Sequence, residues 1–203
     1  MSSLTRAFIA VFPPLEVREA IAGCRDAVRA PHDGVAWVRA ANLHFTLRFL
    51  GDLEPPRIEA ARHALAAAAS APGSTPFRVR LGGPGAFPGP QRARVLWLGA
   101  AEGAAPFALL AGRIESALLR ESFTRADRPF TPHLTLGRPR NPDGAGEAVA
   151  GFLAAVFPAA EFDVTEIVLV SSTLASGGSL YTPIVHAALG VGGDTGSRGG
   201  GAA

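Results

Sequence analysis

The chain lacks lysine altogether, has a single cysteine and contains no long apolar run. All 19 basic residues are arginines, so any cation that binds an anionic ligand is a guanidinium, and catalysis through a lysine Schiff base is excluded. The one cysteine, Cys24, excludes a disulfide framework and a cysteine-based zinc site, and is typical of a reducing compartment. No segment has the length that spanning a bilayer requires. We therefore expect a cytoplasmic protein without membrane contact.

Several functional motifs are also missing. The apolar run at residues 7–12 ends at two prolines and is too short for a secretory signal. The sequence has neither Gly-x-Gly-x-x-Gly nor Gly-Lys-Ser/Thr, so binding of a nucleotide by a Rossmann turn or a P-loop is not supported. No two histidines have His-x-x-x-His or His-Glu-x-x-His spacing. We therefore expect no metal and no cofactor.

What the chain does contain is enough apolar material for a folded core. Hydrophobic residues make up 48% and charged residues 18% of the 203 residues, which excludes wholesale disorder and fits one domain or a tight pair of lobes. The net charge of +2 is too small for a nucleic-acid coat protein. This charge does not exclude a local basic groove. The candidate residues for such a groove are Arg92, Arg94, Arg125 and Arg128, most of which we expect to be ordinary surface charges.

Hydrophobic periodicity predicts about eight strands and four helices, intermixed along the chain. The expected strands cover residues 6–12, 35–38, 43–50, 77–81, 95–98, 131–138, 162–170 and 181–189, and the expected helices cover 15–29, 55–71, 106–121 and 147–157. Gly51-Asp52 is expected to end a strand, and the Gly- and Pro-rich stretch 82–90 to be a long loop. Because some strands follow each other directly, the pattern favours an α+β fold with helices outside. Residues 1–189 are expected to form the domain, and residues 190–203 a disordered tail.

One short motif occurs twice. His44-Phe45-Thr46-Leu47 recurs 89 residues later as His133-Leu134-Thr135-Leu136, in both cases inside an expected strand. With five histidines and ten threonines, a His with a Thr two residues later is expected by chance only roughly 0.25 times. Two copies, each with apolar residues at the remaining positions, therefore indicate an internal repeat that carries chemistry.

Strand geometry explains what this spacing does. Side chains at i and i+2 share a face of a strand, about 6.5–7 Å apart, so each His points the same way as its Thr. The residues between them, Phe45, Leu47, Leu134 and Leu136, point into a core. If two similar lobes face each other, two imidazoles and two hydroxyls converge on one cleft. One imidazole can take a proton while the other gives one, and the hydroxyls can bind phosphate oxygens, which suits displacement at phosphorus.

With the sequence around it, the doubled His-x-Thr-x motif resembles the 2H phosphoesterases, most closely the RNA 2′,3′-cyclic phosphodiesterases, also called 2′-5′ RNA ligases. The resemblance covers about residues 6–189 and rests on the segments 6–11, 37–38, 42–51, 94–99 and 130–138, with Ser171-Ser172 and Tyr181 further on. It implies a bilobal fold in which two pseudo-symmetric, antiparallel-rich sheets flank a central groove. The segment 182–189 departs from the family in lacking a Trp-Pro-Leu-like close.

The resemblance also implies an activity: metal-independent opening of a 2′,3′-cyclic phosphate, at an RNA 3′ end or in a small cyclic nucleotide, to a 2′-phosphate. It assigns His44 as the proton donor and His133 as the proton acceptor, although the residues alone do not order the two. Two alternatives stay open, namely the reverse reaction, 2′-5′ RNA ligation, and a non-catalytic RNA- or nucleotide-binding module. A monomer is expected.

Two arginines near the motifs are further candidates for substrate binding. Arg48 shares strand parity with His44 and Thr46, so it is expected to point toward the mouth of the groove. The resemblance suggests that Arg138 contacts the substrate phosphate. By strict parity Arg138 faces away from His133, unless Gly137 permits a twist or bulge.

The remaining aromatic residues and histidines are expected to be structural or surface groups. Trp37 and Trp97 are interpreted as core residues, like Phe45. The other histidines, in a turn, on a helix face and near the C-terminus, are interpreted as solvated: His32, His63 and His186.

Overall fold

The computed structural model describes residues 4–30, 33–141, 143, 146–175 and 178–190. Within these residues the chain forms four α-helices, α1 (Leu15–Val28), α2 (Pro55–Ala69), α3 (Ala104–Arg120) and α4 (Gly146–Ala154). The strands are β1 (Thr5–Val11), β2 (Val35–Trp37), β3 (Phe45–Leu53), β4 (Phe77–Phe87), β5 (Val95–Glu102), β6 (His133–Pro139), β7 (Glu161–Val164), β8 (Glu166–Ala175) and β9 (Gly178–Ala188). The α+β class is thereby confirmed.

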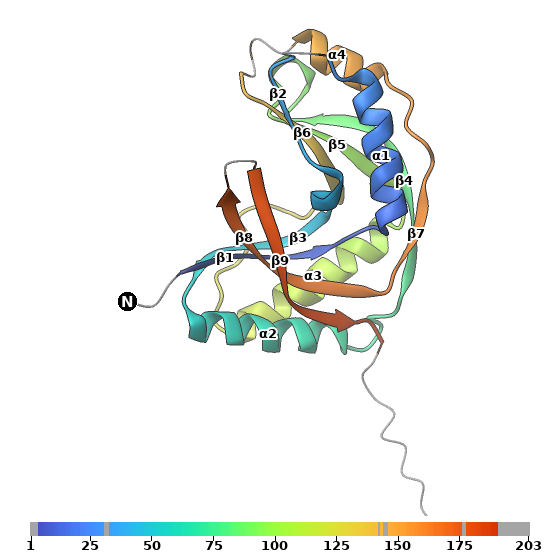
Figure 1. The fold of residues 1–203 in the computed structure, drawn as a ribbon. Helices are drawn as coiled ribbons and strands as arrows, with labels where there is room; N and C mark the ends of the chain where they lie inside the picture. Colours follow the sequence, from blue (N-terminus) through green and yellow to red (C-terminus); the bar gives the residue numbers. More distant parts are fainter. Residues whose placement is uncertain (1–3, 31–32, 142, 144–145, 176–177, 191–203) are drawn as a thin grey trace, which may run out of the picture.

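The strands form one antiparallel sheet in the order β7-β4-β5-β6-β3-β1-β8-β9, with β2 paired to β6. The two halves of this sheet meet at β3 and β6, which pair at Phe45 and Leu134. The two expected sheets are thus halves of one curled sheet (Figure 1). The junction lies inside the two His-x-Thr-x motifs, so the fold itself brings the repeats together.

The helices divide between the two halves (Figure 1). α2 and α3 pack against each other and against the half that contains β1, β3, β8 and β9, while α1 and α4 lie beside the half that contains β2 and β4 to β7. α1 therefore follows β1 in the chain but lies at the other half, and α3 follows β5 but packs against α2 and β3 as well as β5. Two of the four helices are thus exchanged between the halves of the sheet.

The main core confirms the expected alternation of the motifs. Their intervening residues are buried and belong to one cluster: Phe45, Leu47, Leu134 and Leu136. A second, smaller cluster on β1 and β8 joins Phe8 and Ala10 to Val168 and Val170, with Phe12 and Tyr181 packed against it. Because neighbouring residues of β1 belong to different clusters, the second cluster covers the opposite face of the sheet from the main core.

The loop expected at residues 82–90 is wrong for residues 82–87, because β4 continues through the glycines to Phe87 and pairs with β5 as far as Phe87 and Val95. A Cβ atom at Gly85 would lie 2.3 Å from the Trp97 ring, and one at Gly82 would lie 3.1 Å from the Ala101 nitrogen. These glycines therefore permit a close approach between strands, a role that composition alone does not separate from that of a turn.

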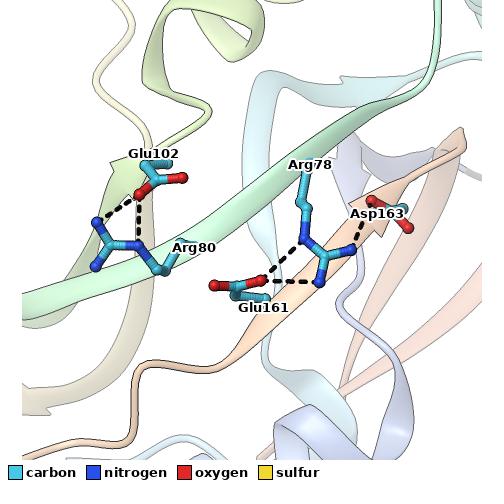
Figure 2. Close-up of polar contacts among 5 residues, drawn as sticks. All are labelled: Arg78, Arg80, Glu102, Glu161 and Asp163. Atoms are coloured by element: carbon cyan, nitrogen blue, oxygen red, sulfur yellow. Dashed lines mark hydrogen bonds and ion pairs between the residues drawn. The ribbon is translucent and has the colours of Figure 1, made fainter.

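The predicted alternation at the start of β4 is confirmed. Val79 and Leu81 are buried, whereas Arg78 and Arg80 point out to solvent-facing carboxylates on the neighbouring strands (Figure 2). Arg78 donates to Glu161 of β7 at 2.8–2.9 Å, and Arg80 donates to Glu102 of β5 at 2.7 Å. Being exposed, these pairs fix side-chain order along the strand more than they stabilise the fold.

Two further expectations are corrected. β3 does not end at Gly51-Asp52 but continues to Leu53, because Gly51 adopts a φ of +80° within the strand. The single strand expected at residues 162–170 is two strands, β7 and β8, which belong to opposite halves of the sheet. Residues 191–203 of the tail expected at 190–203 lie outside the described residues, as does His32.

Candidate active site

The two histidines are held in the same way. His44 lies between the short 3₁₀ helix η1 (Ala40–Asn42) and β3, and His133 is the first residue of β6. In each, Nδ1 lies 2.7 Å from the backbone carbonyl oxygen two residues earlier, that of Asn42 for His44 and that of Thr131 for His133. Because a carbonyl only accepts, Nδ1 carries the hydrogen in both rings. Nε2 is therefore the nitrogen of each ring that is left to accept a proton.

His44 is enclosed by aromatic rings. The Phe8, Phe12 and Tyr181 rings lie with their centroids 4.9, 5.4 and 5.3 Å from that of His44. Its Nε2 lies 2.9 Å from Oγ1 of Thr46. Burial lowers the pKa of His44 from its ordinary 6.5 to about 4, the hydrogen bond to Asn42 opposes the change, and the charges of His133 and Arg138 add to it. In the free protein at neutral pH, His44 is therefore uncharged.

His133 has fewer aromatic neighbours and is less deeply buried. Phe87 and Trp97 approach it edge-on, with centroids 5.2 and 6.5 Å away. Burial lowers the pKa of His133 too, with the charge of Arg138 adding to the lowering and the hydrogen bond to Thr131 opposing it. Because a charged His133 also lowers the pKa of His44, the two imidazoles lie within electrostatic reach of each other.

A cavity of about 460 Å³ opens on the inner surface of the curl. This central hollow brings together both motif threonines, His44 and Arg138, so residues 89 positions apart face one space. His133 does not line the hollow itself, but it precedes Thr135, which does. The lining residues are Arg6, Phe8, Val38, Asn42, His44, Thr46, Phe49, Thr135, Arg138, Leu174, Ser179 and Tyr181.

Both motifs end in a β-bulge at the same position. On β6, Thr135 pairs with Trp97 and Gly137 pairs with Leu96, so Leu136 is an extra residue. On β3, Thr46 pairs with Ala10 and Arg48 with Ile9, so Leu47 is the extra residue. An extra residue reverses the alternation beyond it. A residue four or five positions after a motif histidine therefore lies on the face opposite to the one that strict alternation predicts.

The two bulges determine which face of the sheet each candidate arginine occupies. Arg138 lines the hollow, because the bulge lies next to Gly137 and reverses the alternation there. A Cβ at Gly137 would lie 2.7 Å from Trp37 and Val35, which explains the glycine. The expectation for Arg48 is wrong, because the bulge turns it to the other face, where its Nε lies 3.1 Å from Glu115 of α3. Strict strand parity fails at both arginines for the same reason.

Of the expectations for the tryptophans and the other histidines, three are confirmed and one is wrong. Trp37 packs against the main core as predicted. Trp97 does not, because its neighbours Leu96 and Leu98 take the core face and leave its ring stacked on Phe87, 4.8 Å away, beside His133. His63 and His186 are exposed as predicted, the latter against Glu166.

Of the four arginines named for a basic groove, none lines the central hollow. Arg125 and Arg128 border a separate cavity next to Arg48 and Glu115. Arg92 pairs with Asp143, and Arg94 is exposed.

Several residues of the hollow are not predicted from the sequence, most clearly Arg6, Phe8, Asn42 and Phe49. Parity along β1 could have placed Phe8 opposite the core-facing Ala7 and Ile9. Asn42 holds the β8–β9 hairpin through a 2.7 Å hydrogen bond from its side chain to the Ser179 carbonyl. No local signal indicates the bulge that exposes Phe49, because an apolar residue before Gly51 fits an ordinary buried strand.

Within the part of the chain that the structure describes, no group of three or more His, Cys, Asp or Glu residues could hold a metal ion. Independence of metal stays a prediction. No helix among these residues combines the length and apolar character that crossing a membrane requires.

A curled antiparallel sheet that brings two His-x-Thr-x motifs to its inner surface is the fold of the 2H phosphoesterases. The chain belongs to the 2′-5′ RNA ligase superfamily, whose family model matches residues 13–174.

Similar proteins agree with this assignment. A relative from Escherichia coli (strain K12) is 35% identical over 193 residues, 93% of this chain and 99% of its own length. One from Methanothermobacter thermautotrophicus is 33% identical over 180 residues, 87% and 95% of the two chains. Both are named RNA 2′,3′-cyclic phosphodiesterase.

Solved structures show the same fold. The Thermus thermophilus protein TT0787 matches with a TM-score of 0.75 at 32% identity, over 91% of this chain and 98% of its own. Escherichia coli LigT complexed with 3′-AMP matches with a TM-score of 0.71 at 30% identity, over 92% and 98%.

Proposed function

We propose that this chain is an RNA 2′,3′-cyclic phosphodiesterase that opens the cyclic phosphate to a 2′-phosphate by a two-histidine mechanism. The observation that carries the proposal is the convergence of His44, Thr46, Thr135 and Arg138 on one hollow, beside His133. Two relatives that this chain matches over almost their whole length are named RNA 2′,3′-cyclic phosphodiesterase. Arg138 supplies the cation, and the two threonines supply hydroxyl donors, for the non-bridging phosphate oxygens.

In the proposed reaction, water attacks phosphorus opposite the ribose 3′ oxygen. Nε2 of His133 accepts the proton of the attacking water, and Nε2 of His44 donates a proton to the departing 3′ oxygen. The P–O3′ bond breaks as the new P–O bond forms, and the phosphate remains on O2′. The protein ends with one proton moved from His44 to His133, and exchange with solvent restores the starting state.

The lowered pKa values fit such a pair only once the substrate is present. In the free protein both imidazoles are neutral at neutral pH, because burial and Arg138 lower both pKa values. The negative charge of a bound phosphodiester counters the charge of Arg138 and favours the imidazolium form. Substrate binding therefore promotes the protonation that His44 needs to act as the acid.

The same site run backward joins a 2′,3′-cyclic phosphate end to a 5′-hydroxyl end through a 2′-5′ bond, and the description of the matching family model favours keeping this second activity. By microscopic reversibility one histidine pair serves both directions, and water at high concentration favours hydrolysis. A non-catalytic RNA-binding module is the remaining alternative. We take residues 1–189 as one bilobal domain acting as a monomer in the cytoplasm, since all the proposed functional residues lie in one chain and its single cysteine suits a reducing compartment.

The test is product analysis with an RNA that ends in a 2′,3′-cyclic phosphate, in the presence of EDTA. We expect complete conversion to a 2′-phosphate end without added metal. A 3′-phosphate product would reverse the assignment of the leaving oxygen, and loss of turnover in EDTA with rescue by a divalent ion would exclude the two-histidine mechanism. Binding without turnover would support the binding module. An added 5′-hydroxyl RNA tests ligation in the same mixture.

A further inference from the structure

A second cavity adjoins the central hollow. It has a volume of about 360 Å³ and shares Tyr181 with the hollow. Phe12 and Tyr181 both line it, and their ring centroids lie 5.4 and 5.3 Å from that of His44. It therefore begins one layer of side chains away from the acid–base site. The lining residues of this side cavity are Phe12, Pro13, Arg18, Ala41, Glu166, Val168, Val170, Tyr181, Pro183 and His186.

The side cavity has an apolar floor. Val168 and Val170 of β8 are buried there, in the second cluster, which also contains Phe8 of the hollow. Because the side chains of this cluster share one face of the sheet, the two cavities open on the same side of it. The rings of Phe12 and Tyr181 pack against the same cluster. Apolar and aromatic walls of this kind suit the flat face of a nucleobase.

The cation of the side cavity is Arg18, which is held in a fixed position. Its guanidinium donates to the backbone carbonyls of Pro13 at 2.9 Å and Ala41 at 2.7 Å, and lies over the Phe12 ring at 5.8 Å. These bonds use two of the five N–H donors of an arginine and fix the plane of the others. The remaining donors can bind an anionic oxygen without further ordering of the side chain.

Arg18 also lacks a counter-ion. Among the described residues, no carboxylate lies within ion-pair distance of it, and the acidic residue of the side cavity, Glu166, instead accepts a hydrogen bond from His186 at 3.0 Å. Burial lowers the pKa of Arg18, so water solvates this cation incompletely. A fixed, partly desolvated guanidinium without a carboxylate partner favours an anionic ligand.

We propose that the side cavity binds the nucleotide that precedes the terminal one, so that the protein recognises the last two nucleotides of an RNA. Arg18 contacts the phosphodiester that joins them, and Phe12 contacts the base of the preceding nucleotide. The proposal rests on the proposed function, in which the terminal nucleotide occupies the central hollow. It makes an RNA end a better substrate than a free cyclic nucleotide.

The experiment compares three substrates that end in the same 2′,3′-cyclic phosphate: a mononucleotide, its 5′-methyl phosphodiester and a dinucleotide. We expect kcat/KM of the wild type to rise about tenfold with the phosphodiester and a further 5- to 150-fold or so with the second base. Arg18→Gln should abolish the first increase, and Phe12→Ala the second. Each increase is a ratio within one variant, so a change in the chemistry at His44 cancels. An unchanged first increase in Arg18→Gln would overturn the proposal.

The dependence on salt tests the phosphate contact in the wild type itself. The first increase should fall with salt concentration, with a slope of about −0.7 in log–log form, because one phosphate is neutralised. Arg18→Lys keeps the charge and should keep this slope. A wild type without the first increase, or with one that salt does not change, would overturn the proposal even if Arg18→Gln failed to fold.

Arg57 and Phe123 provide a matched control. Arg57 lies 3.8 Å over the Phe123 ring and donates to the Glu121 carbonyl, but neither side chain lines the hollow or the side cavity. Arg57→Gln and Phe123→Ala should leave both increases at their wild-type values, and losses equal to those of the Arg18 and Phe12 variants would contradict the proposal.

Failure of the proposed function would give a different result, because the wild type would then open none of the three substrates. Calorimetric affinities for the corresponding 2′-phosphates would in that case decide whether the side cavity binds a second nucleotide. Tighter binding of the dinucleotide that depends on Arg18 would support it, and equal affinities for all three would overturn it.

Discussion

The two copies of the motif share a backbone and differ in their surroundings. Both histidines donate from Nδ1 to a carbonyl two residues back, and both strands bulge at the last motif residue. Yet His44 is packed among three aromatic rings and bonded to Thr46, whereas His133 meets two ring edges. The repeat fixes which ring nitrogen of each histidine is left free of the backbone, and the surroundings set how easily each histidine is protonated.

The same difference continues beyond the bulges. After the bulge of β6 comes Arg138, which carries a charge into the hollow, and after that of β3 comes Phe49, which carries an aromatic ring into it. One strand framework thus presents an anion-binding group from one half and an apolar surface from the other. A duplicated motif gives rise to a site with two unlike ends, which suits a substrate that is itself asymmetric.

Removing either histidine is the severest test of the comparison. General acid–base catalysis by one positioned group contributes roughly 10²–10⁴-fold, so His44→Ala and His133→Ala should each lower kcat by at least that factor. The losses should not multiply in the double variant, because the two groups act as one unit. Single-turnover rates on a 2′,3′-cyclic nucleotide measure this. Full activity of both single variants would exclude the phosphodiesterase mechanism.

The pH profile then assigns the roles. The wild type should show a bell for kcat/KM whose high-pH limb begins below pH 6.5, because both pKa values are lowered in the free protein. In kcat the same limb should move to higher pH, since bound phosphate favours the imidazolium. If His44 is the acid, its removal abolishes the fall at high pH. Loss of the low-pH limb instead would reverse the assignment.

The burial of His44 also predicts a stability difference. Its pKa is lowered in the folded chain, so between pH 6.5 and about 4 the unfolded chain binds more protons, and the free energy of unfolding decreases as the pH is lowered. A shift from 6.5 to about 4 corresponds to about 3 kcal/mol. His44→Gln should therefore lose about 3 kcal/mol less than the wild type on acidification from pH 7 to 4, measured by urea unfolding. His63→Gln, at an exposed position, should behave as the wild type does, and equal pH dependence of all three proteins would contradict the burial argument.

The two arginines test the bulges. Arg138→Ala removes a charged contact to phosphate, worth about 3 kcal/mol, and should lower kcat/KM roughly 10²-fold. Arg48 lies one position closer to its motif than Arg138 does, and it pairs with Glu115 on the other face of the sheet. Arg48→Ala removes this ion pair and should leave kcat/KM within a few-fold of the wild type. Steady-state kinetics on folded protein decide, and the opposite ranking would mean that the bulges do not reverse the faces.

Much of this site could be predicted from the sequence, because strand alternation needs only the period of the side chains. His44, Thr46, Phe45 and Leu47 take the faces that alternation assigns. The sequence does not predict the faces of Arg48, Phe49 and Trp97, because the bulges and the burial of Leu96 and Leu98 depend on partner strands far away in the chain. The glycines of β4 are typical of a turn in the sequence for a related reason. Only the Trp97 ring, which packs against Gly85 in the structure, shows that they permit a close contact between strands.

The threonines give the smallest expected effect and the finest comparison. Each hydroxyl donates one hydrogen bond to a charged phosphate oxygen, worth about 1.5 kcal/mol, so Thr135→Ala should lower kcat/KM about tenfold. Thr46 also lies 2.9 Å from His44 Nε2, and its removal should additionally lower kcat by loosening the ring of the proton donor. Thr46→Ser and Thr135→Ser keep the hydroxyls and should recover most of the activity. Equal losses in both alanine variants would show that the His44–Thr46 contact does not matter, and wild-type kinetics of the double alanine variant would show that neither hydroxyl reaches the substrate.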